Sequence, residues 1–252
     1  MLSKNNIKFI NSLRYKKYRQ IHQHFFVEGE KLVNEAFHSG FNIKQIIATE
    51  KGLKSFDEKL LINKNLIITN EKELKKISAF TTPNKIFAII EIPETNNYKI
   101  EIQKELVLGF EEINDPGNFG TIIRTADWFG IKTVFCSTNS VDIYNPKVVQ
   151  ATMGAVFRVK LICCDLKKIV NLYKNKMNVY GTFISGNNIF NEELPDNGLI
   201  LFGNESKGLS EELESLVDYK ITIPNYSNKN IKTESLNISS AVAIVCAQFR
   251  NK

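Results

Sequence analysis

The chain has 252 residues, of which 43% are hydrophobic and 24% charged, and its formal net charge is +6. These values suit a globular protein of one large or two small domains. No apolar run approaches the roughly 18 residues of a membrane span, and the basic N-terminus lacks the apolar core of a secretory signal, so we expect a cytoplasmic protein without membrane contact.

The first part of the chain predicts a small α/β domain over residues 1–95. The expected elements, in chain order, are a helix over 25–40, a strand over 43–49, a helix over 53–61, a strand over 66–69, a helix over 71–80 and a strand over 86–92. Their hydrophobic residues alternate between the helical and the strand period. A polar stretch with Pro93 follows, and we place a linker at 96–104.

A second α/β series predicts a larger domain over residues 105–252. Strands are expected over 105–113, 132–137, 159–164, 178–184, 198–204 and 221–224. Helices are expected directly after the turn at 114–120 and over 145–157, 166–174, 210–217 and 235–250. Strands that alternate with helices are typical of a parallel sheet covered on both faces.

Basic residues gather in the first 100 residues, which hold 17 Lys and Arg against 10 Asp and Glu. No acid precedes Glu28, and the cations there are interleaved with tyrosines. Positive charge beside aromatic rings suits RNA, because it offers contacts to both phosphates and bases. The candidate RNA-binding residues are Arg14, Lys16, Lys17 and Arg19. A lysine-rich solvated helix face explains the same pattern, so the sequence leaves both interpretations open.

The stretch 114–130, NDPGNFGTIIRTADWFG, joins a turn to an apolar helix that carries Arg124. A turn after a buried strand lies at the carboxyl edge of a parallel sheet, where open α/β folds bind ligands. The guanidinium of Arg124 is a forked donor that matches phosphate. The alternative is a structural loop in which Arg124 pairs with Asp127. The glycines give G-x-x-G and do not match the dinucleotide-binding pattern G-x-G-x-x-G.

Two later stretches also combine turns with polar groups. In LFGNESKGLS (201–210) the lysine of a P-loop is replaced by Leu209, so the glycines suggest instead a backbone close to a ligand, with Glu205 directed at it. In 221–245, small polar residues begin an otherwise apolar helix, and such groups need partners when they are buried. A strand-to-helix turn and a capping turn explain these two stretches when each is taken alone.

Together the three stretches resemble the SpoU (TrmH-like) class of the SPOUT methyltransferases. The motifs are N-D-P-x-N-x-G-x-I-x-R-T-A at 114–126, G-N-E-x-x-G-L-S at 203–210 and I-P…S-L-N-x-S at 223–239. Residues 13–92 are similar, more loosely, to the L30e-like RNA-binding domain that often precedes this catalytic domain. The resemblance implies a small L30e-like α/β domain followed by a parallel-sheet SPOUT domain with a C-terminal trefoil knot. It also implies a homodimer that uses S-adenosylmethionine to methylate a ribose 2′-hydroxyl of RNA.

The same resemblance implies the site residues. The side chains that match the family's active site are Asn118, Arg124, Glu205, Ser235 and Asn237. The positions whose backbone matches the family's cofactor contacts are Gly203, Ile223, Leu236 and, more weakly, Thr182. The chain departs from the family pattern at Ser206, where a glycine is usual, and at Asn225, where Met is commoner and the following loop is long.

The chemistry needs little besides positioning. A methyl group on a sulfonium is already activated, so its transfer requires neither a metal nor a covalent nucleophile. The sequence has no histidine after His38 and no Cys/His pattern of a metal site. Because a guanidinium hardly ever loses its proton, we expect Arg124 to hold the ribose and an adjacent phosphate, while a phosphate or Glu205 accepts the proton.

The separate basic N-terminal domain favours ribosomal RNA of the 23S type as the substrate, because it offers a second grip on a large folded RNA. The alternative within enzymes is a tRNA ribose methyltransferase. The rival from another class is a non-catalytic RNA-binding or ribosome-assembly protein on the same fold. Binding of S-adenosylmethionine would distinguish the rival from the enzymes.

Overall fold

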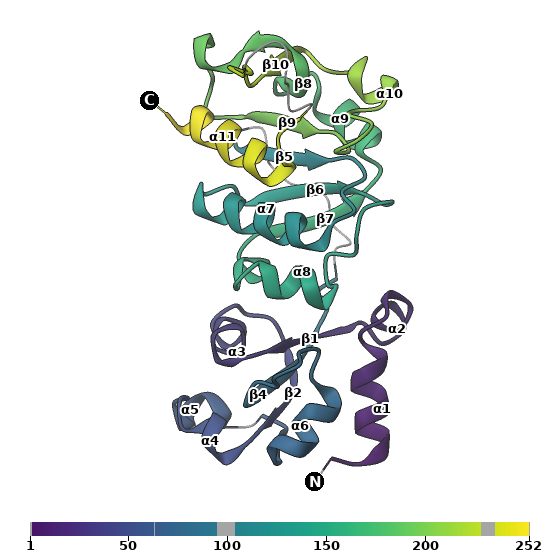
Figure 1. Ribbon diagram of the computed structural model, residues 1–252, viewed down its shortest axis with the longest axis vertical. Coiled ribbons are helices and arrows are strands. Elements are labelled where there is room, and N and C mark those ends of the chain that lie inside the picture. The colour runs from purple at the N-terminus through teal and green to yellow at the C-terminus, as the bar shows by residue number, and fades with distance from the viewer. Residues whose placement is uncertain (1, 63, 95–103, 228–234, 252) are drawn as a thin grey trace. The chain divides into compact units, whose positions relative to one another are not determined.

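A computed structural model describes residues 2–62, 64–94, 104–227 and 235–251. The chain packs into two compact units (Figure 1). The first unit comprises Met1–Thr95 and Asp142–Phe157, and the second comprises Asn96–Val141 and Arg158–Lys252. Among the described residues, no helix is both long and apolar enough to cross a membrane.

The first unit is a four-stranded sheet with helices on both faces. Its elements are α1 (Lys4–Ser12), α2 (Lys16–His22), β1 (His24–Glu28), α3 (Glu30–Phe37), β2 (Ile43–Ala48), α4 (Glu50–Leu53), α5 (Glu58–Leu61), β3 (Leu66–Ile68), α6 (Glu71–Ile77) and β4 (Ile86–Glu91). The strand order is β1-β4-β2-β3. Strand β4 is antiparallel to β1 and β2, whereas β2 and β3 are parallel. The prediction of a small N-terminal α/β domain is therefore confirmed.

The prediction of one helix over 25–40 is wrong in its first part. Residues 25–28 belong to β1, whose side chains from Phe25 to Glu28 are all buried, as in a strand covered on both faces. Gly29 then separates strand from helix, since its φ of +106° lies in a region that other residues rarely adopt. Only 30–37 is helical. The expected helix over 53–61 is likewise divided between α4 and α5.

Residues 142–157 pack with the first unit, although chain order places them between two strands of the second. They contain α8 (Pro146–Ala151) and a 3₁₀ turn at Ala155–Phe157. The buried ring of Phe25 lies 4.6 Å from that of Tyr144 and 6.3 Å from that of Phe157. Asp142 forms an ion pair with the buried Arg19. This segment thus completes the core of the first unit.

The second unit is built on a six-stranded sheet in the order β10-β8-β9-β5-β6-β7. Its strands are β5 (Leu106–Phe110), β6 (Thr133–Ser137), β7 (Lys160–Cys164), β8 (Val179–Asn188), β9 (Gly198–Phe202) and β10 (Tyr219–Thr222). Every pair of neighbours is parallel. The predicted parallel sheet is therefore confirmed.

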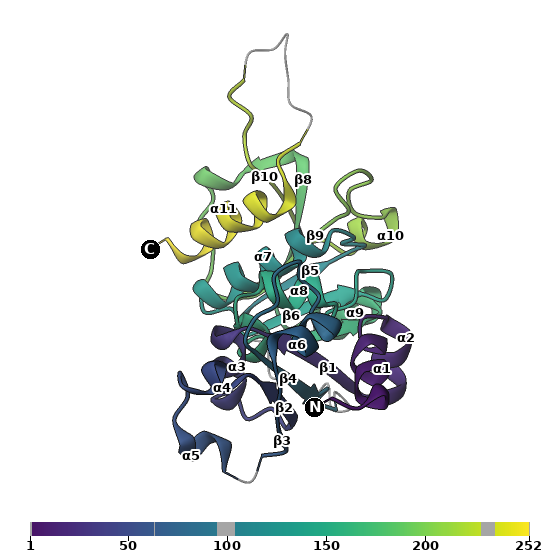
Figure 2. The ribbon, with the colours of Figure 1, turned by 60° about the horizontal axis from the view of Figure 1, so that its bottom comes forward.

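Helices cover both faces of this sheet. They are α7 (Pro116–Trp128), α9 (Leu166–Tyr173), α10 (Glu211–Glu214) and α11 (Ile238–Arg250), with a 3₁₀ turn at Ile189–Asn191. Helices α7 and α11 lie side by side (Figures 1 and 2), joined at one end by a 3.1 Å hydrogen bond from Arg250 Nε to the Phe129 carbonyl. Apolar side chains of α9 share a core with β5, β6 and β9 on the opposite face. Because all neighbouring strands of this sheet are parallel, their carboxyl ends lie at one common edge.

Candidate functional site

The loops that follow β5 and β9 meet at the carboxyl edge of the six-stranded sheet. Both strands lie in the middle of the sheet and are paired in parallel, from Leu106 with Gly198 to Phe110 with Phe202. The next residue continues this pairing, since Glu111 N–H donates to the Phe202 carbonyl at 2.9 Å. The two sequence motifs that begin at 114 and 203 are thus brought together by strand pairing.

Helix α7 begins with a well-formed cap that fixes Asn118. Asp115 is the N-cap residue and Pro116 occupies the first helical turn, where its missing N–H costs nothing. The Asp115 carboxylate accepts the Asn118 backbone N–H at 2.7 Å. Asn118 therefore stands in the first turn of the helix, where its side chain is free to reach the neighbouring loops.

Three of the predicted catalytic side chains form one hydrogen-bonded chain. Asn237 Nδ2 donates to Asn118 Oδ1 at 3.0 Å, and Asn118 Nδ2 donates to Glu205 Oε1. Asn237 is itself the N-cap of α11, where its Oδ1 accepts the Ser239 backbone N–H at 2.9 Å. These contacts set the orientation of both side-chain amides, because each amide nitrogen donates to the next residue of the chain, which ends at the Glu205 carboxylate. Glu205 and Asn237 are exposed, Asn118 is half-buried, and the three come from three separate sequence motifs.

The loop that carries Glu205 is folded tightly on itself. A Cβ atom at Gly203 would lie 2.1 Å from the Gly208 carbonyl carbon and 2.2 Å from the Leu209 nitrogen, so this position requires glycine. Asn204 and Gly208 exchange two backbone hydrogen bonds of 3.0 and 2.8 Å. Gly208 has a φ of +72°, whereas Ser206 has no positive φ. Serine in place of the usual glycine at 206 therefore introduces no backbone strain.

Asn204 and Glu112, which are not among the predicted site residues, attach this loop to the end of β5. Asn204 Nδ2 donates to the Glu112 carbonyl at 2.9 Å, and its Oδ1 accepts the backbone N–H groups of Ser206 and Lys207. Glu112 has a φ of +51°, an uncommon conformation for a residue with a side chain. Asn204 lies inside the G-N-E motif, but no sequence signal marks Glu112.

Arg124 lies six residues beyond Asn118 on α7 and is exposed. The guanidinium forms no hydrogen bond or ion pair with any residue that the structure describes. The carboxylate of Asp127, the alternative partner, instead forms an ion pair with Arg158, with an Nη2–Oδ2 distance of 2.8 Å. The pairing of Arg124 with Asp127 is therefore wrong, and the arginine is available to a ligand.

The remaining predicted site residues lie at or near the same edge. Gly203 follows β9 and Ile223 follows β10. Thr182 lies within β8, where its hydroxyl donates to the Leu201 carbonyl of β9 at 3.1 Å. Ser235 and Leu236 precede the cap of α11, and both are exposed. Neither Ser235 nor Arg124 joins the hydrogen-bonded chain.

The predicted RNA-binding cations of the first unit divide into two pairs. Lys16 and Lys17 are exposed on α2. Arg19 is only 2% exposed, and it binds Asp142 and the Leu13 carbonyl. Arg14 donates to the carbonyls of Ile77 and Ser78 at the end of α6. The structure thus gives both arginines internal partners, and the burial of Arg19 removes it from the surface that RNA can contact.

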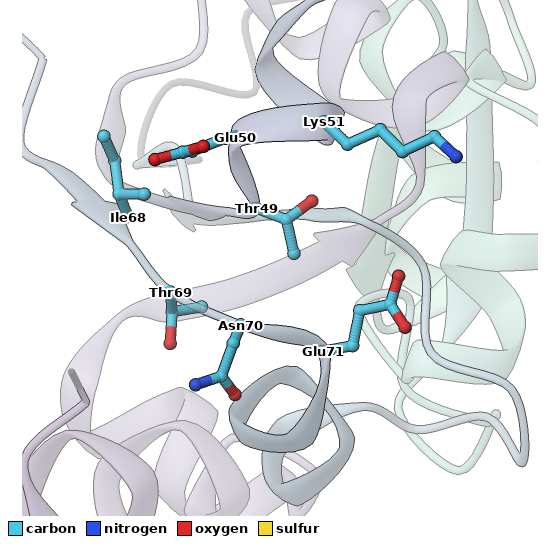
Figure 3. A pocket seen from close by; sticks show the side chains of 7 residues that line it. All are labelled: Thr49, Glu50, Lys51, Ile68, Thr69, Asn70 and Glu71. Carbon is cyan, nitrogen blue, oxygen red and sulfur yellow. The ribbon is translucent and has the colours of Figure 1, made fainter.

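A hollow of about 510 Å³ in the first unit is lined by none of the predicted site residues (Figure 3). It lies at the carboxyl ends of β2 and β3 and includes Thr49 and Asn70. Both side chains cap short helices, since Thr49 accepts the Gly52 N–H and Asn70 the Glu73 N–H, each at 3.0 Å. Their polar groups are used within the fold. Among the described residues, no group of three His, Cys, Asp or Glu could hold a metal ion.

Two family models match the chain in succession. The model of the SpoU rRNA Methylase family matches residues 105–247, which is more than half of the chain. The model of the MRM3-like substrate binding domain matches residues 4–88. The first match contains all the predicted catalytic and cofactor-binding residues, and the second contains the four predicted RNA-binding residues.

Individual relatives match the chain over almost its whole length. The 23S rRNA (guanosine(2553)-2′-O)-methyltransferase RlmP of Bacillus subtilis is 29% identical over 247 residues, which are 97% of this chain and 95% of that protein. A solved structure of a TrmH-family protein from Porphyromonas gingivalis is 34% identical, covers 99% of this chain and 98% of its own, and has a TM-score of 0.86. The AdoMet-bound rRNA methyltransferase of Sinorhizobium meliloti is 27% identical, with coverages of 99% and 96% and a TM-score of 0.87.

Proposed function

Because this chain belongs to the SpoU rRNA methylase family, we propose that it transfers a methyl group from S-adenosylmethionine to a ribose 2′-hydroxyl of ribosomal RNA. The observation that carries the proposal is the chain of hydrogen bonds from Asn237 through Asn118 to Glu205. Its central residue, Asn118, lies on the helix that also presents the exposed Arg124. A protein that only kept the fold would have no need to align these polar side chains at the surface.

The cofactor suits the edge where the strands end. The tight turn at Gly203 leaves no room for a side chain and brings the backbone of the 203–208 loop to the surface beside it. We assign cofactor binding to the backbone of Gly203, Ile223 and Leu236, and a weaker contact to Thr182, whose hydroxyl is already used within the sheet. Bound there, S-adenosylmethionine would supply a methyl group activated by its sulfonium.

Arg124 has the role of gripping the RNA. Its guanidinium stays protonated and has no partner among the described residues, so its donors are free for a phosphate oxygen or a ribose oxygen. A positive charge beside the 2′-hydroxyl favours the alkoxide form and makes the oxygen a better nucleophile. Holding the ribose in place contributes as well, because a transfer in line depends on orientation.

Glu205 is the group we assign to accept the hydroxyl proton. One carboxylate oxygen, Oε1, accepts from Asn118, whereas Oε2 forms no hydrogen bond with the described residues. Asn118 orients this carboxylate directly, and Asn237 orients it through Asn118. Ser235 lies two residues before Asn237 and is exposed. A phosphate of the RNA that Arg124 holds is the alternative acceptor.

Ribosomal RNA is the preferred substrate over tRNA. The relative RlmP carries rRNA in its name and matches the chain over both units. The N-terminal unit matches a substrate-binding domain, which provides a grip separate from the catalytic unit. We further propose a cytoplasmic location and a trefoil knot near the C-terminus, in keeping with the family resemblance.

We also propose that the protein is a homodimer. Trp128 at the end of α7 is 84% exposed, and a large apolar ring at such a site is a typical interface anchor. Light scattering on the purified protein is expected to give twice the mass of the chain, and Trp128→Glu is expected to reduce it to that of one chain. A wild-type protein that stays a monomer at all concentrations would contradict this assignment.

The activity is tested by incubating the protein with labelled S-adenosylmethionine and 23S ribosomal RNA transcript. Digestion to nucleosides then separates ribose-methylated from base-methylated products by mass spectrometry. We expect label in a 2′-O-methylnucleoside. Label in a base would contradict the proposed reaction, and a protein that does not bind S-adenosylmethionine in calorimetry would support the non-catalytic rival. The same assay with tRNA decides between the two RNA substrates.

A further inference from the structure

Helices α1 and α6 cover the same face of the first sheet. Ile10 and Leu13 from the first helical segment and Leu74 and Ile77 from α6 share one apolar core with the sheet. The helices lie side by side (Figure 2), and Asn11 Nδ2 donates to the Lys76 carbonyl at 3.0 Å. Two helices that pack side by side on one core turn their polar sides outward together. Their outer sides therefore form one continuous surface.

Lysines dominate this surface. The exposed lysines are Lys4 and Lys8 on α1 and Lys72, Lys75 and Lys76 on α6. Helix α2, which directly follows the turn after α1, adds the exposed Lys16 and Lys17. The spacings i, i+3 and i+4 place the lysines of each of α1 and α6 along one side of their helix. The described residues before Glu28 include no acid, and α6 contributes only Glu71 and the buried Glu73. The surface is thus a strongly positive patch.

The cations near this surface have two roles, because Arg14 bonds to the fold whereas the lysines face solvent. Arg14 joins the turn after α1 to the end of α6 through the carbonyls of Ile77 and Ser78. Glu73, the acid best placed to neutralise the patch, accepts the backbone N–H of Leu2 and the hydroxyl of Thr69, and its other oxygen lies 3.7 Å from the Lys76 ammonium. The other lysines of the surface form no ion pair with the described residues, so their charge is available. Beside them, the ring of Tyr15 is 66% exposed.

We infer that this lysine surface of α1, α2 and α6 binds the phosphate backbone of RNA, and that α6 contributes to the binding beside the N-terminal basic segment. Phosphates need only compact positive charges, which lysines supply. The exposed rings of Tyr15 and Tyr18 offer stacking faces for unpaired bases. The inference rests on the proposed function for the identity of the polyanion as RNA. An anionic lipid surface is the competing partner.

The test compares two triple variants with equal loss of charge. Lys72→Gln, Lys75→Gln and Lys76→Gln neutralise α6, whereas the matched control changes three exposed lysines elsewhere on the unit, at Lys44, Lys54 and Lys59. Glutamine keeps the helix propensity of lysine, and circular dichroism checks the fold. The probe is 23S ribosomal RNA transcript without S-adenosylmethionine, titrated by fluorescence anisotropy at several salt concentrations.

The α6 variant is expected to bind the RNA about tenfold more weakly, with a salt slope smaller by about 2, since each lost phosphate contact removes about 0.7 to 0.9. The control is expected to bind like the wild type. Equal binding by the α6 variant and the wild type, or an equal loss in both variants, would overturn the inference. So would binding to phosphatidylglycerol vesicles, but not to RNA, that depends on these lysines.

Binding is measured apart from catalysis, so the two proposals fail separately. Methyl transfer to RNA together with unaltered RNA binding by the α6 variant would refute the lysine surface and leave the reaction intact. A protein that never transfers a methyl group but loses RNA binding in the α6 variant would refute the reaction and leave this surface established.

Discussion

Replacing Asn118 by Asp would set a second carboxylate against Glu205. In the native chain, Asn118 donates to Glu205 and accepts from Asn237 at 3.0 Å. Aspartate has the same shape and still accepts from Asn237, but it exchanges the donor to Glu205 for a negative charge. The position is in the first turn of α7, where a carboxylate favours the helix by about 0.3–1 kcal/mol. The fold should therefore be unharmed and the effect local.

The magnitude follows from the short contact and from the exposure of Glu205 to water. Two like charges about 3 Å apart repel by about 1.4 kcal/mol when water surrounds them, which corresponds to about one pH unit. The repulsion disfavours the ionised carboxylate that is to accept the proton. The acid limb of the pH–rate profile should therefore move upward by about one unit in Asn118→Asp. Asn118→Ala loses the hydrogen bond without adding charge, so its rate should fall with little movement of that limb.

The assay is the initial rate of methyl transfer to ribosomal RNA between about pH 5 and 9, with the cofactor at saturation. Calorimetry with S-adenosylmethionine and a thermal melt of each variant serve as controls, and both should match the wild type. If Asn118→Asp and Asn118→Ala give profiles with the same acid limb, ionisation of Glu205 does not limit the rate. The assignment of Glu205 as proton acceptor would then be refuted.

Three further outcomes follow from the structure. A fragment of residues 1–94 should melt at a lower temperature than the first unit does in the whole chain, because it lacks the segment 142–157 that completes its core; equal melting would contradict this. The Leu2 N–H lowers the pKa of Glu73 below its ordinary 4.5, so this carboxylate stabilises the fold above about pH 4.5 and the gain is lost as pH falls through the lowered value. Glu73→Gln should accordingly lose less unfolding free energy on acidification than the wild type in chemical denaturation, and an equal loss would exclude the effect. Burial raises the pKa of the Cys246 thiol to about 12, so iodoacetamide at about pH 8 should label the exposed Cys163 first, as peptide mass spectrometry would reveal.

The strands were the most predictable part of the fold. Each has a short apolar run between turn residues, and each predicted strand has a counterpart in the structure. The helix predicted over 25–40 failed because Phe25 and Phe26 look equally apolar in a helix and in a strand buried on both faces. Only the left-handed backbone at Gly29 separates the two, and sequence spacing does not reveal it.

The association of 142–157 with the first unit could not be inferred from chain order. This segment lies between two strands of the second unit, so periodicity assigns its helix there. What places it is tertiary contact, through the Phe25 and Tyr144 rings and the ion pair of Asp142 with Arg19. The boundaries at 95 and 105 remain predictions.

The candidate site was predictable to the level of residues, but its contacts were not. Motif spacing named Asn118, Glu205 and Asn237, and the structure brings them into one hydrogen-bonded chain. The sequence left open whether Arg124 pairs with Asp127, and Arg158, which takes Asp127 instead, lies 31 residues after Asp127 in the chain. Likewise, Arg19 was predicted to be a surface cation from the local charge alone. Its burial depends on the packing of the folded unit, which the sequence does not reveal.

The central claim is that Arg124 grips the RNA for methylation of a ribose. The most direct test maps 2′-O-methyl marks in the ribosomal RNA of cells that lack the gene and carry either the wild-type or the Arg124→Ala copy. We predict one mark that the wild type restores and Arg124→Ala does not, although the purified variant binds S-adenosylmethionine with native affinity. Restoration of the mark by Arg124→Ala would contradict the claim, as would the absence of any ribose mark that depends on the gene.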